Sequence, residues 1–496
     1  MIDFVFAYLH PTYLSFFLIL CIFVFGLFLL FKIQKTSYII FFLLAWLPLE
    51  TFVLLHTPID YYAYVKYIPE VLLYGFVIGS WITYIRRHGR LFSRDPLFGW
   101  FFFYMVIAVL SLLVNWYNPL VWVFGLRQLL RFALIAFAIL FMQYHKKQVR
   151  SFVLFGFGMI VLEAVFGFIQ YLAQGQLDPY LFSSQVISIG NTALLGGLEQ
   201  FWAPGSRIFA TLGRYDRLGS LLMIGVVMLF PFLYMFKKQE RKWGYGAIFM
   251  FLLVVLILTL SRASWLAAFF GIATIGILLH KDRRIVTVFI AFMLFLGVYL
   301  TGYALVHDNV LSITETRSQT LAERMFEAVS FDAWRGSYEG FGRIFFIIET
   351  PHVVIPAAPL FGHGPGRYGS GVAGSLVLTD VYDELHLPFG IQNKFGQIDN
   401  NWMAIWGEVG TLGLISWMGV FIAIIGMANV VRRRTKDPYV QAYAEGCIGM
   451  TVGMITLGFF GPYFEFRASM FYFWLLVGIL VLYWREEKQR GSFLTW

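Results

Sequence analysis

Charged residues are scarce in this chain of 496 residues, since only 13% of its positions carry Asp, Glu, Lys or Arg. Hydrophobic residues make up 59% and aromatic residues 20%, and the mean hydropathy is +0.73. A soluble domain of this length needs far more charge to cover its surface. The composition therefore excludes a soluble globular protein and indicates a polytopic membrane protein.

Cysteine is also rare. The two cysteines, Cys21 and Cys447, both fall inside apolar runs, and they give no indication of a disulfide framework or a metal site. The sequence shows no heptads, low-complexity tracts or obvious internal repeats. What the sequence has in abundance is apolar runs of about 20 residues, the length that crosses a hydrocarbon core.

We expect an all-α polytopic membrane protein with about 13 transmembrane helices. The helices are predicted at about 13–33, 37–55, 68–86, 97–114, 121–143, 151–172, 217–236, 243–260, 264–280, 285–306, 402–430, 439–460 and 468–484.

Basic residues in short loops predict the orientation of these helices. With this number of spans, all of the basic clusters fall on one side, which is then the cytoplasmic side. The clusters lie at 86–94, 145–150, 237–242, 280–284, 432–434 and 485–490. The C-terminus is then cytoplasmic and the N-terminus outside. The net charge of +9 is mostly a topology signal, and we expect no nucleic-acid partner.

This layout divides the chain into four parts. They are N-terminal transmembrane helices at 1–150, central transmembrane helices at 151–306 with an outer loop at 173–216, a large extracytoplasmic loop at 307–401, and C-terminal transmembrane helices at 402–496. Long ordered loops outside a membrane bundle usually carry function. Functional residues are therefore expected on the outer side.

Several arginines lie on this outer side, where basic residues are disfavoured. Arg262 lies at a turn between two spans, Arg207 just ahead of the seventh span, and Arg343 in the large loop. Arg127 and Arg131 are four residues apart, so they share one helix face. The forked guanidinium suits phosphate oxygens. Together these arginines predict an outer-leaflet pocket for a membrane-bound diphosphate.

A simpler interpretation applies to each arginine taken singly. An arginine near a helix end can extend to the lipid headgroups and do nothing more. For Arg214 and Arg217, which flank Asp216, we expect a local surface ion pair. Arg262 fits the simpler interpretation least well, because a charge at the membrane edge is costly and indicates function.

The large loop ends in two polar stretches. "PLFGHGPGRYGSG" (359–371) is rich in glycine and predicts a tight turn that either approaches a ligand or is an ordinary loop. In the second stretch, Asp399 and Asn400 begin the eleventh predicted span, where such residues are often helix N-caps. The functional alternative is that Asp399 is a general base. Glu408, about two turns further along, is expected to be a structural hydrogen-bonding carboxylate.

Four segments together resemble the O-antigen ligase and O-antigen polymerase superfamily of bacterial membrane glycosyltransferases. They are an arginine followed by "ATLGRYDRLGSLL", the turn "TLSRASWLAAFFG", an arginine about twenty residues before "PLFGHGPGRYG", and "DNNWMAIWGEVGTLGLISW". They cover roughly residues 200–425 in the order found in the family. The first 150 residues resemble the family only as a stack of spans.

The resemblance implies a C-type glycosyltransferase-like fold in the bacterial cytoplasmic (inner) membrane, with the active site facing the periplasm or cell exterior. The donor would be an undecaprenyl-diphosphate-linked glycan. Arg207 and Arg262 would correspond to the diphosphate-contacting arginines of the family, and Arg343 to a third basic position. Ligases of this family usually carry a His-Asn pair where this chain has Asp399 and Asn400. A polymerase is therefore favoured, and the alternative is an O-antigen ligase that transfers glycan to a lipid or protein acceptor.

The expected chemistry is glycosyl transfer to a sugar hydroxyl of a glycan acceptor. Arginines stabilise the departing diphosphate, and Asp399 accepts the hydroxyl proton. His363 and His386 are alternative acceptor-side residues, although neither occupies the matching position. We expect no cofactor and no metal. The carboxylates of Asp380, Asp383 and Glu384 are the one group in the sequence that could still bind a metal ion.

The rival function is a transporter of polysaccharide or lipid-linked glycan. Transporters tend to carry charges near the bilayer midplane, and Glu163, in the middle of the sixth predicted span, is the one residue that fits. We expect Glu163 to pair instead with an arginine from a neighbouring span.

Overall fold

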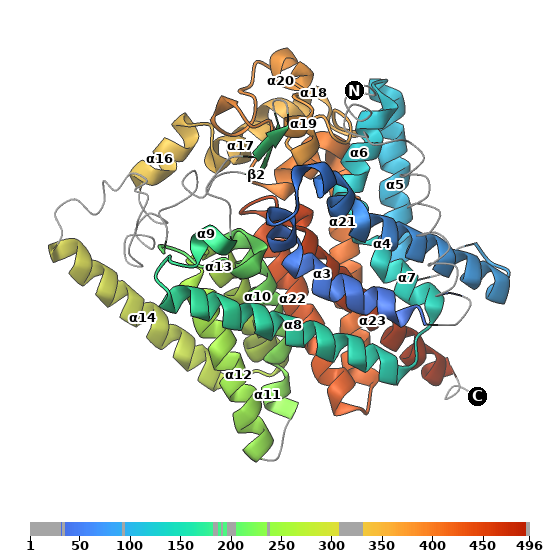
Figure 1. Ribbon diagram of the computed structural model, residues 1–496, viewed down its shortest axis with the longest axis vertical. Helices are drawn as coiled ribbons and strands as arrows, with labels where there is room; N and C mark the ends of the chain where they lie inside the picture. Colours follow the sequence, from blue (N-terminus) through green and yellow to red (C-terminus); the bar gives the residue numbers. More distant parts are fainter. Residues whose placement is uncertain are drawn as a thin grey trace.

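The computed structural model describes residues 31, 35–91, 95–181, 187–189, 192–195, 205–235, 239–306 and 331–492. The described chain is almost entirely helical (Figure 1). The exception is a short antiparallel ribbon of β1 (Ile187–Ile189) and β2 (Thr192–Leu195). Almost all of the predicted span at 13–33 lies outside the described residues.

Among the described residues, eight helices are long and apolar enough to cross a membrane, judged by length and composition. A ninth is counted if α6 (Pro119–Leu130) and α7 (Leu134–Met142), which are bent by 65° at their junction, form one span. The eight are α3 (Ser37–Leu55), most of α4 (Ile59–His88), α5 (Pro96–Asn115), α8 (Lys146–Leu172), α10 (Tyr215–Leu229) with α11 (Phe232–Met235), α13 (Arg262–Ala273) with the π-helix η3 (Thr274–Leu279), α21 (Asn401–Arg434) and α23 (Arg467–Ser492).

Three further predicted spans are helical without meeting this criterion. They are α12 (Gln239–Leu258), α14 (Arg283–Val306) and α22 (Pro438–Gly458). α22 packs against α10, α13 and α21, so protein rather than lipid covers most of its surface and it needs less apolar character. The total of 13 spans stays a prediction.

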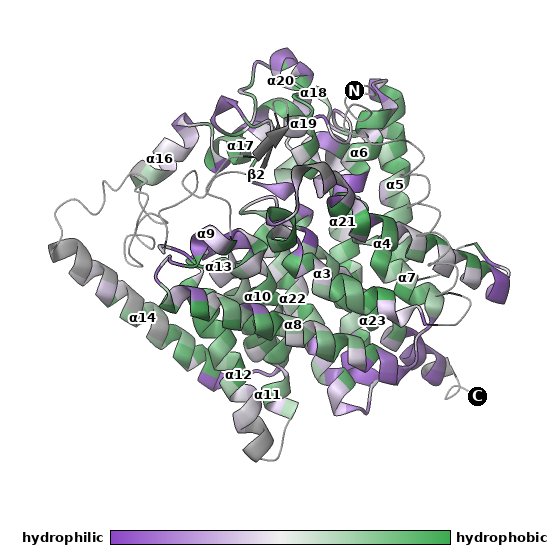
Figure 2. Ribbon diagram, viewed as in Figure 1, coloured by the Kyte–Doolittle hydropathy of each residue, from purple (hydrophilic) through white to green (hydrophobic). Residues whose placement is uncertain are grey.

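The described part of the large loop, residues 331–401, folds as a set of short elements at one end of the bundle (Figure 1). They are α16 (Phe331–Glu339), α17 (Arg343–Glu349), the π-helix η5 (Thr350–Val354), α18 (Ile355–Ala357), α19 (Gly371–Ser375), α20 (Asp380–Glu384) and the 3-10 turn η6 (Ile391–Asn393). α21 runs from this end to the basic residues 432–434, and the middle of the bundle is hydrophobic between two more hydrophilic ends (Figure 2).

Aromatic side chains form the core next to the loop end. Trp417 of α21 and Trp474 of α23 are fully buried and meet edge to face, with ring centroids 6.2 Å apart. Phe464 packs on Trp402 and Phe421 at centroid distances of 5.3 and 5.5 Å. Such aromatic clusters bury much apolar area and fix ring orientations. Phe464 thereby anchors the 3-10 turn η7 (Tyr463–Glu465) beside the start of α21.

Candidate active site

The turn that carries Arg262 is held by close packing. Arg262 is the first residue of α13, and Ser261 occupies the N-cap position. Gly219 of α10 approaches the turn so closely that a Cβ atom at this position would lie 2.6 Å from Ser264 Oγ. Only glycine permits this approach. The start of α13 is therefore fixed against α10 at the loop end of the bundle.

Arg207 is held by an aromatic ring. Its guanidinium carbon lies 4.3 Å from the centroid of the Tyr215 ring, and only 8% of the residue is exposed. Tyr215 is the first residue of α10. A guanidinium over an aromatic face gains a cation–π interaction and keeps its N–H donors available at the ring edge. Arg207 and Arg262 thus lie at the loop-side ends of two packed helices.

The predicted ion pair next to α10 is confirmed for Arg214. Its Nε and NH2 atoms donate to the two carboxylate oxygens of Asp216 at 3.1 and 2.9 Å, a bidentate geometry. The side chain of Asp216 is only 11% exposed, so the pair is more buried than the surface pair that we expected. Arg217 does not join it through its guanidinium, which lies 5.8 Å from the Phe466 ring.

Arg343 and Asp399 are neighbours. Arg343 begins α17, and its Nε donates to the backbone oxygen of Asp399 at 3.1 Å. Its NH2 lies 3.7 Å from the Asp399 carboxylate, and the side chains are 33% and 41% exposed. The carboxylate therefore lies beside a cation and remains open to solvent.

Asn400, and not Asp399, is the N-cap of α21. The Asn400 side-chain oxygen accepts a hydrogen bond from the backbone N–H of Met403 at 3.0 Å, the usual capping contact. Its amide nitrogen donates to the backbone oxygen of Phe459 at 3.2 Å. The Asp399 side chain is thus free of the capping role, which was the simpler of its two interpretations.

Tyr463 connects these parts, and the sequence reasoning missed it. This buried tyrosine of η7 hydrogen-bonds Ser261, and it lies within electrostatic range of Asp216 and Arg343. Burial raises the pKa of its hydroxyl, which therefore stays protonated. The signal that was available is the segment "GPYFEFR" (461–467), an aromatic and charged turn between two spans on the predicted outer side.

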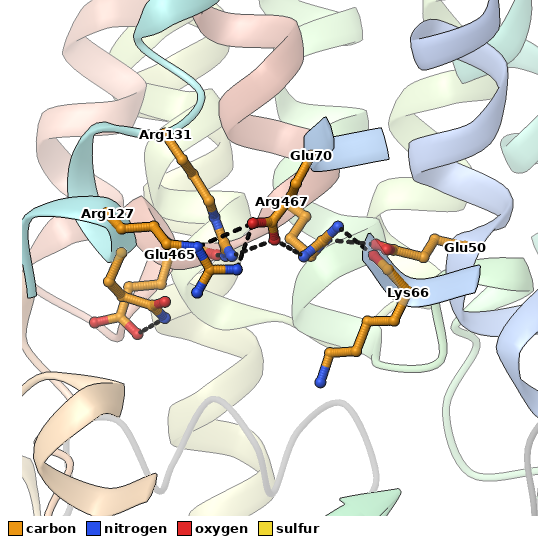
Figure 3. Close-up of polar contacts among 8 residues, drawn as sticks. Glu50, Lys66, Glu70, Arg127, Arg131, Glu465 and Arg467 are labelled. Atoms are coloured by element: carbon orange, nitrogen blue, oxygen red, sulfur yellow. Dashed lines mark hydrogen bonds and ion pairs between the residues drawn. The ribbon is translucent and has the colours of Figure 1, made fainter. Parts of the chain in front are cut away.

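Arg127 and Arg131 lie in a second charged cluster, shown in Figure 3. Both bind Glu70 of α4, which confirms that they share one face: Arg127 Nε donates at 3.0 Å and Arg131 NH1 at 3.1 Å. Arg467 of α23 binds Glu70 and also Glu50 of α3. The single pocket shared with Arg262 stays a prediction. Charges at the ends of predicted spans were the overlooked signal for Glu50 and Glu70.

The glycine-rich turn packs on protein. The backbone N–H groups of His363 and Gly364 donate to the carbonyl oxygens of Gly407 and Glu408 at 2.9 and 2.8 Å. Gly366 has a positive φ of 87°, and its N–H donates to Glu408 Oε1 at 2.9 Å. Glu408 is thus a structural hydrogen-bonding carboxylate, as predicted. The contacts of the turn favour the interpretation of it as an ordinary loop.

Neither alternative histidine joins Asp399 in the arrangement described above. His363 is buried and its Nε2 lies 3.1 Å from the backbone oxygen of Val354. Burial lowers the pKa of His363. His386 is an exposed residue, the second after the end of α20. In the same region Arg367 Nε donates to Asp380 at 2.9 Å. Among the described residues, no three His, Cys, Asp or Glu side chains are placed to hold a metal.

Glu163 was predicted to pair with an arginine, and this prediction is wrong. Glu163 is fully buried, and its carboxylate accepts hydrogen bonds from the Thr211 hydroxyl at 2.6 Å and the Thr211 N–H at 3.2 Å. The 3-10 turn η2 (Ala210–Leu212) brings these donors to the helix. The two neutral donors give this buried carboxylate a structural role. Glu163 therefore no longer favours a transporter.

Comparison with known proteins gives one family. Residues 246–418 match the family model described as O-antigen ligase, and a search of curated proteins finds no match. The matched region contains Arg262, Arg343 and Asp399, and its first and last residues lie in α12 and α21. Proteins of this family take part in the assembly of cell-surface glycans. The chain thus has the apolar helices of a multi-pass membrane protein, and about a third of it is similar to the O-antigen ligase family.

Proposed function

We propose that this protein is a glycosyltransferase that polymerises glycan from an undecaprenyl-diphosphate-linked donor at the outer face of the bacterial cytoplasmic membrane. The observation that carries the proposal is the gathering of charged residues at the loop end of the bundle. Arg207, Arg262 and Arg343 begin or precede helices there, and Asp399 lies beside Arg343.

The arginines are proposed to bind the donor diphosphate. As the bond between the anomeric carbon and the diphosphate oxygen breaks, negative charge accumulates on the diphosphate. Fixed guanidinium groups in a partly dry site stabilise that charge without having to reorganise. Arg207 keeps its position through Tyr215, and the start of α13 keeps its position through the contact with Gly219. Both features supply the rigidity that such stabilisation requires.

Asp399 is proposed to be the general base. The acceptor hydroxyl oxygen forms the new bond to the anomeric carbon, and its proton passes to the Asp399 carboxylate. A carboxylate that is 41% exposed and not used as a helix cap is available to a sugar hydroxyl. The neighbouring Arg343 places a positive charge 3.7 Å from this carboxylate.

A polymerase is proposed over a ligase because Asp399 stands where ligases of the family usually carry histidine. The glycans that accumulate on the lipid carrier when the protein is removed from cells test this choice. Loss of a polymerase should leave single lipid-linked repeat units. Long lipid-linked chains would instead indicate the loss of a ligase, and an unchanged pool of lipid-linked glycans would contradict both activities.

A further inference from the structure

The cluster around Glu70 holds more positive than negative charge. Arg127, Arg131 and Arg467 all bind the Glu70 carboxylate, and Arg467 Nε also lies 2.6 Å from Glu50 (Figure 3). Lys66 is one turn before Glu70 on α4, so four cationic side chains stand with two carboxylates. At the edge of the cluster, Arg217 and Glu465 add one charge of each sign. The excess is two positive charges in either count.

Much of this excess charge is buried. Glu70 is 2% exposed and Arg131 is 6% exposed. An uncompensated charge in a poorly solvated region is strongly unfavourable, and buried charges are stable only when they are paired. Among the described residues, the Nε donor of Arg131 has no hydrogen-bond partner. The Lys66 ammonium points away from both carboxylates (Figure 3). The cluster is thus short of an anion.

The cluster is also accessible from one side. The Arg127 side chain is 28% exposed, and Lys66 is partly exposed. Arg217 lies within electrostatic range of Glu50 and Arg467 and also of Arg214 and Asp216. The two groups of charges therefore lie at the same end of the bundle. η7 and the residues directly after it contribute to both, through Tyr463 on one side and Arg467 on the other.

We propose that Lys66, Arg127 and Arg131 form a second binding site, for the phosphate or diphosphate of a membrane lipid. Guanidinium and ammonium groups at a helix end suit phosphate oxygens, and at a membrane edge the phosphate that reaches them is carried by a lipid. The inference extends the proposed function, since a polymerase acts on two lipid-linked glycans. The same chemistry fits the headgroup of an anionic phospholipid.

Native mass spectrometry of the full-length protein in detergent tests this site with two probes, undecaprenyl diphosphate without a sugar and phosphatidylglycerol. The test variant is K66Q/R127Q. Removing two charged donors should weaken the binding of one of the lipids by about tenfold or more, the scale expected for losing charge-assisted hydrogen bonds. Lys394→Gln is the matched control, because Lys394 is exposed in the large loop.

Each outcome decides one point. Loss of one of two bound undecaprenyl diphosphates supports the site and assigns it to a second lipid-linked substrate. Selective loss of phosphatidylglycerol supports the site and assigns it to the phospholipid headgroup. Wild-type binding of both lipids by K66Q/R127Q overturns the proposal. Lys66→Gln alone is measured as well, because Lys66 contacts neither carboxylate and its loss leaves the ion pairs of Glu70 in place.

This test is separable from the test of the proposed function. Arg262→Ala should remove the donor diphosphate and leave the Lys66 and Arg127 site occupied. If Arg262→Ala binds undecaprenyl diphosphate as the wild type does, the donor assignment fails while the second site stands. If only K66Q/R127Q behaves as the wild type, the second site fails while the donor assignment stands.

Discussion

Substitution of Asp399 by Asn separates the two interpretations of this residue. Asn has nearly the same shape as Asp, but its neutral amide cannot accept a proton as the Asp carboxylate can. The cap of α21 is Asn400, so the substitution leaves the helix start intact. Arg343 Nε binds the backbone oxygen of residue 399, which the variant retains.

The structure sets the expected magnitudes. The Asp399 carboxylate lies 3.7 Å from Arg343 NH2, and both side chains are at least one-third exposed. Such an ion pair contributes roughly 0–1 kcal/mol, so the free energy of unfolding should fall by about 1 kcal/mol or less. Loss of a general base should lower the transfer rate by roughly a hundredfold or more. A large loss of rate with almost unchanged stability is therefore expected.

The assay measures transfer from a lipid-diphosphate donor by the purified protein, together with the thermal unfolding midpoint in detergent. Asp383→Asn is the control, because Asp383 is an exposed aspartate of the same loop and should leave both values unchanged. Asp399→His restores the residue that ligases of the family carry, and partial activity is expected. Near-normal transfer by Asp399→Asn would refute the assignment of Asp399 as the base.

Three further predictions concern charge, topology and pH. Arg262→Lys keeps the charge but loses the forked geometry, so turnover should fall about tenfold or more, and full turnover in a normally inserted protein would contradict the diphosphate role. Glu384→Cys should react with an impermeant thiol reagent from outside and Lys436→Cys should not, because α21 separates them; the reverse labelling would contradict the orientation. Burial lowers the pKa of His363, so the unfolded state binds a proton more readily, and the unfolding midpoint should fall as the pH drops below about 6.5. His363→Gln should flatten this part of the pH profile, and an unchanged profile would exclude His363 as its source.

The positions of the helices followed from the sequence because apolar runs of membrane length have few alternatives. The predicted span at 121–143 shows the limit of this reasoning. It is apolar apart from Arg127, Gln128, Arg131 and the terminal Gln143, yet the chain bends by 65° between α6 and α7. The bend lies beside Arg131, whose guanidinium reaches Glu70 and the backbone oxygen of Glu465. Those partners are distant in sequence, so local pattern did not reveal the bend.

The candidate site was likewise predicted only in part, because local sequence reveals some of its residues but not their distant partners. Arg262 and Asp399 were singled out as candidates because polar residues at span ends are costly and indicate function, and Arg343 because it lies in the large outer loop. The pairing of Arg127 and Arg131 with Glu70 depends on contacts about 60 residues apart in the chain, and no local spacing encodes them. Glu163 was assigned to the wrong partner for a related reason. Ion pairing was the expected solution for a buried carboxylate, whereas the neutral donors of Thr211 satisfy it.

The proposed activity is the transfer of glycan from a lipid diphosphate. The most direct measurement incubates the purified protein with a lipid-linked oligosaccharide that carries a label on the sugar, and follows both the glycan length and the release of undecaprenyl diphosphate. We expect longer lipid-linked chains, with one undecaprenyl diphosphate released for each unit added and both signals absent from Arg262→Ala. Chain growth that Arg262→Ala retains in full, or no release of undecaprenyl diphosphate by the wild type, would contradict this proposal.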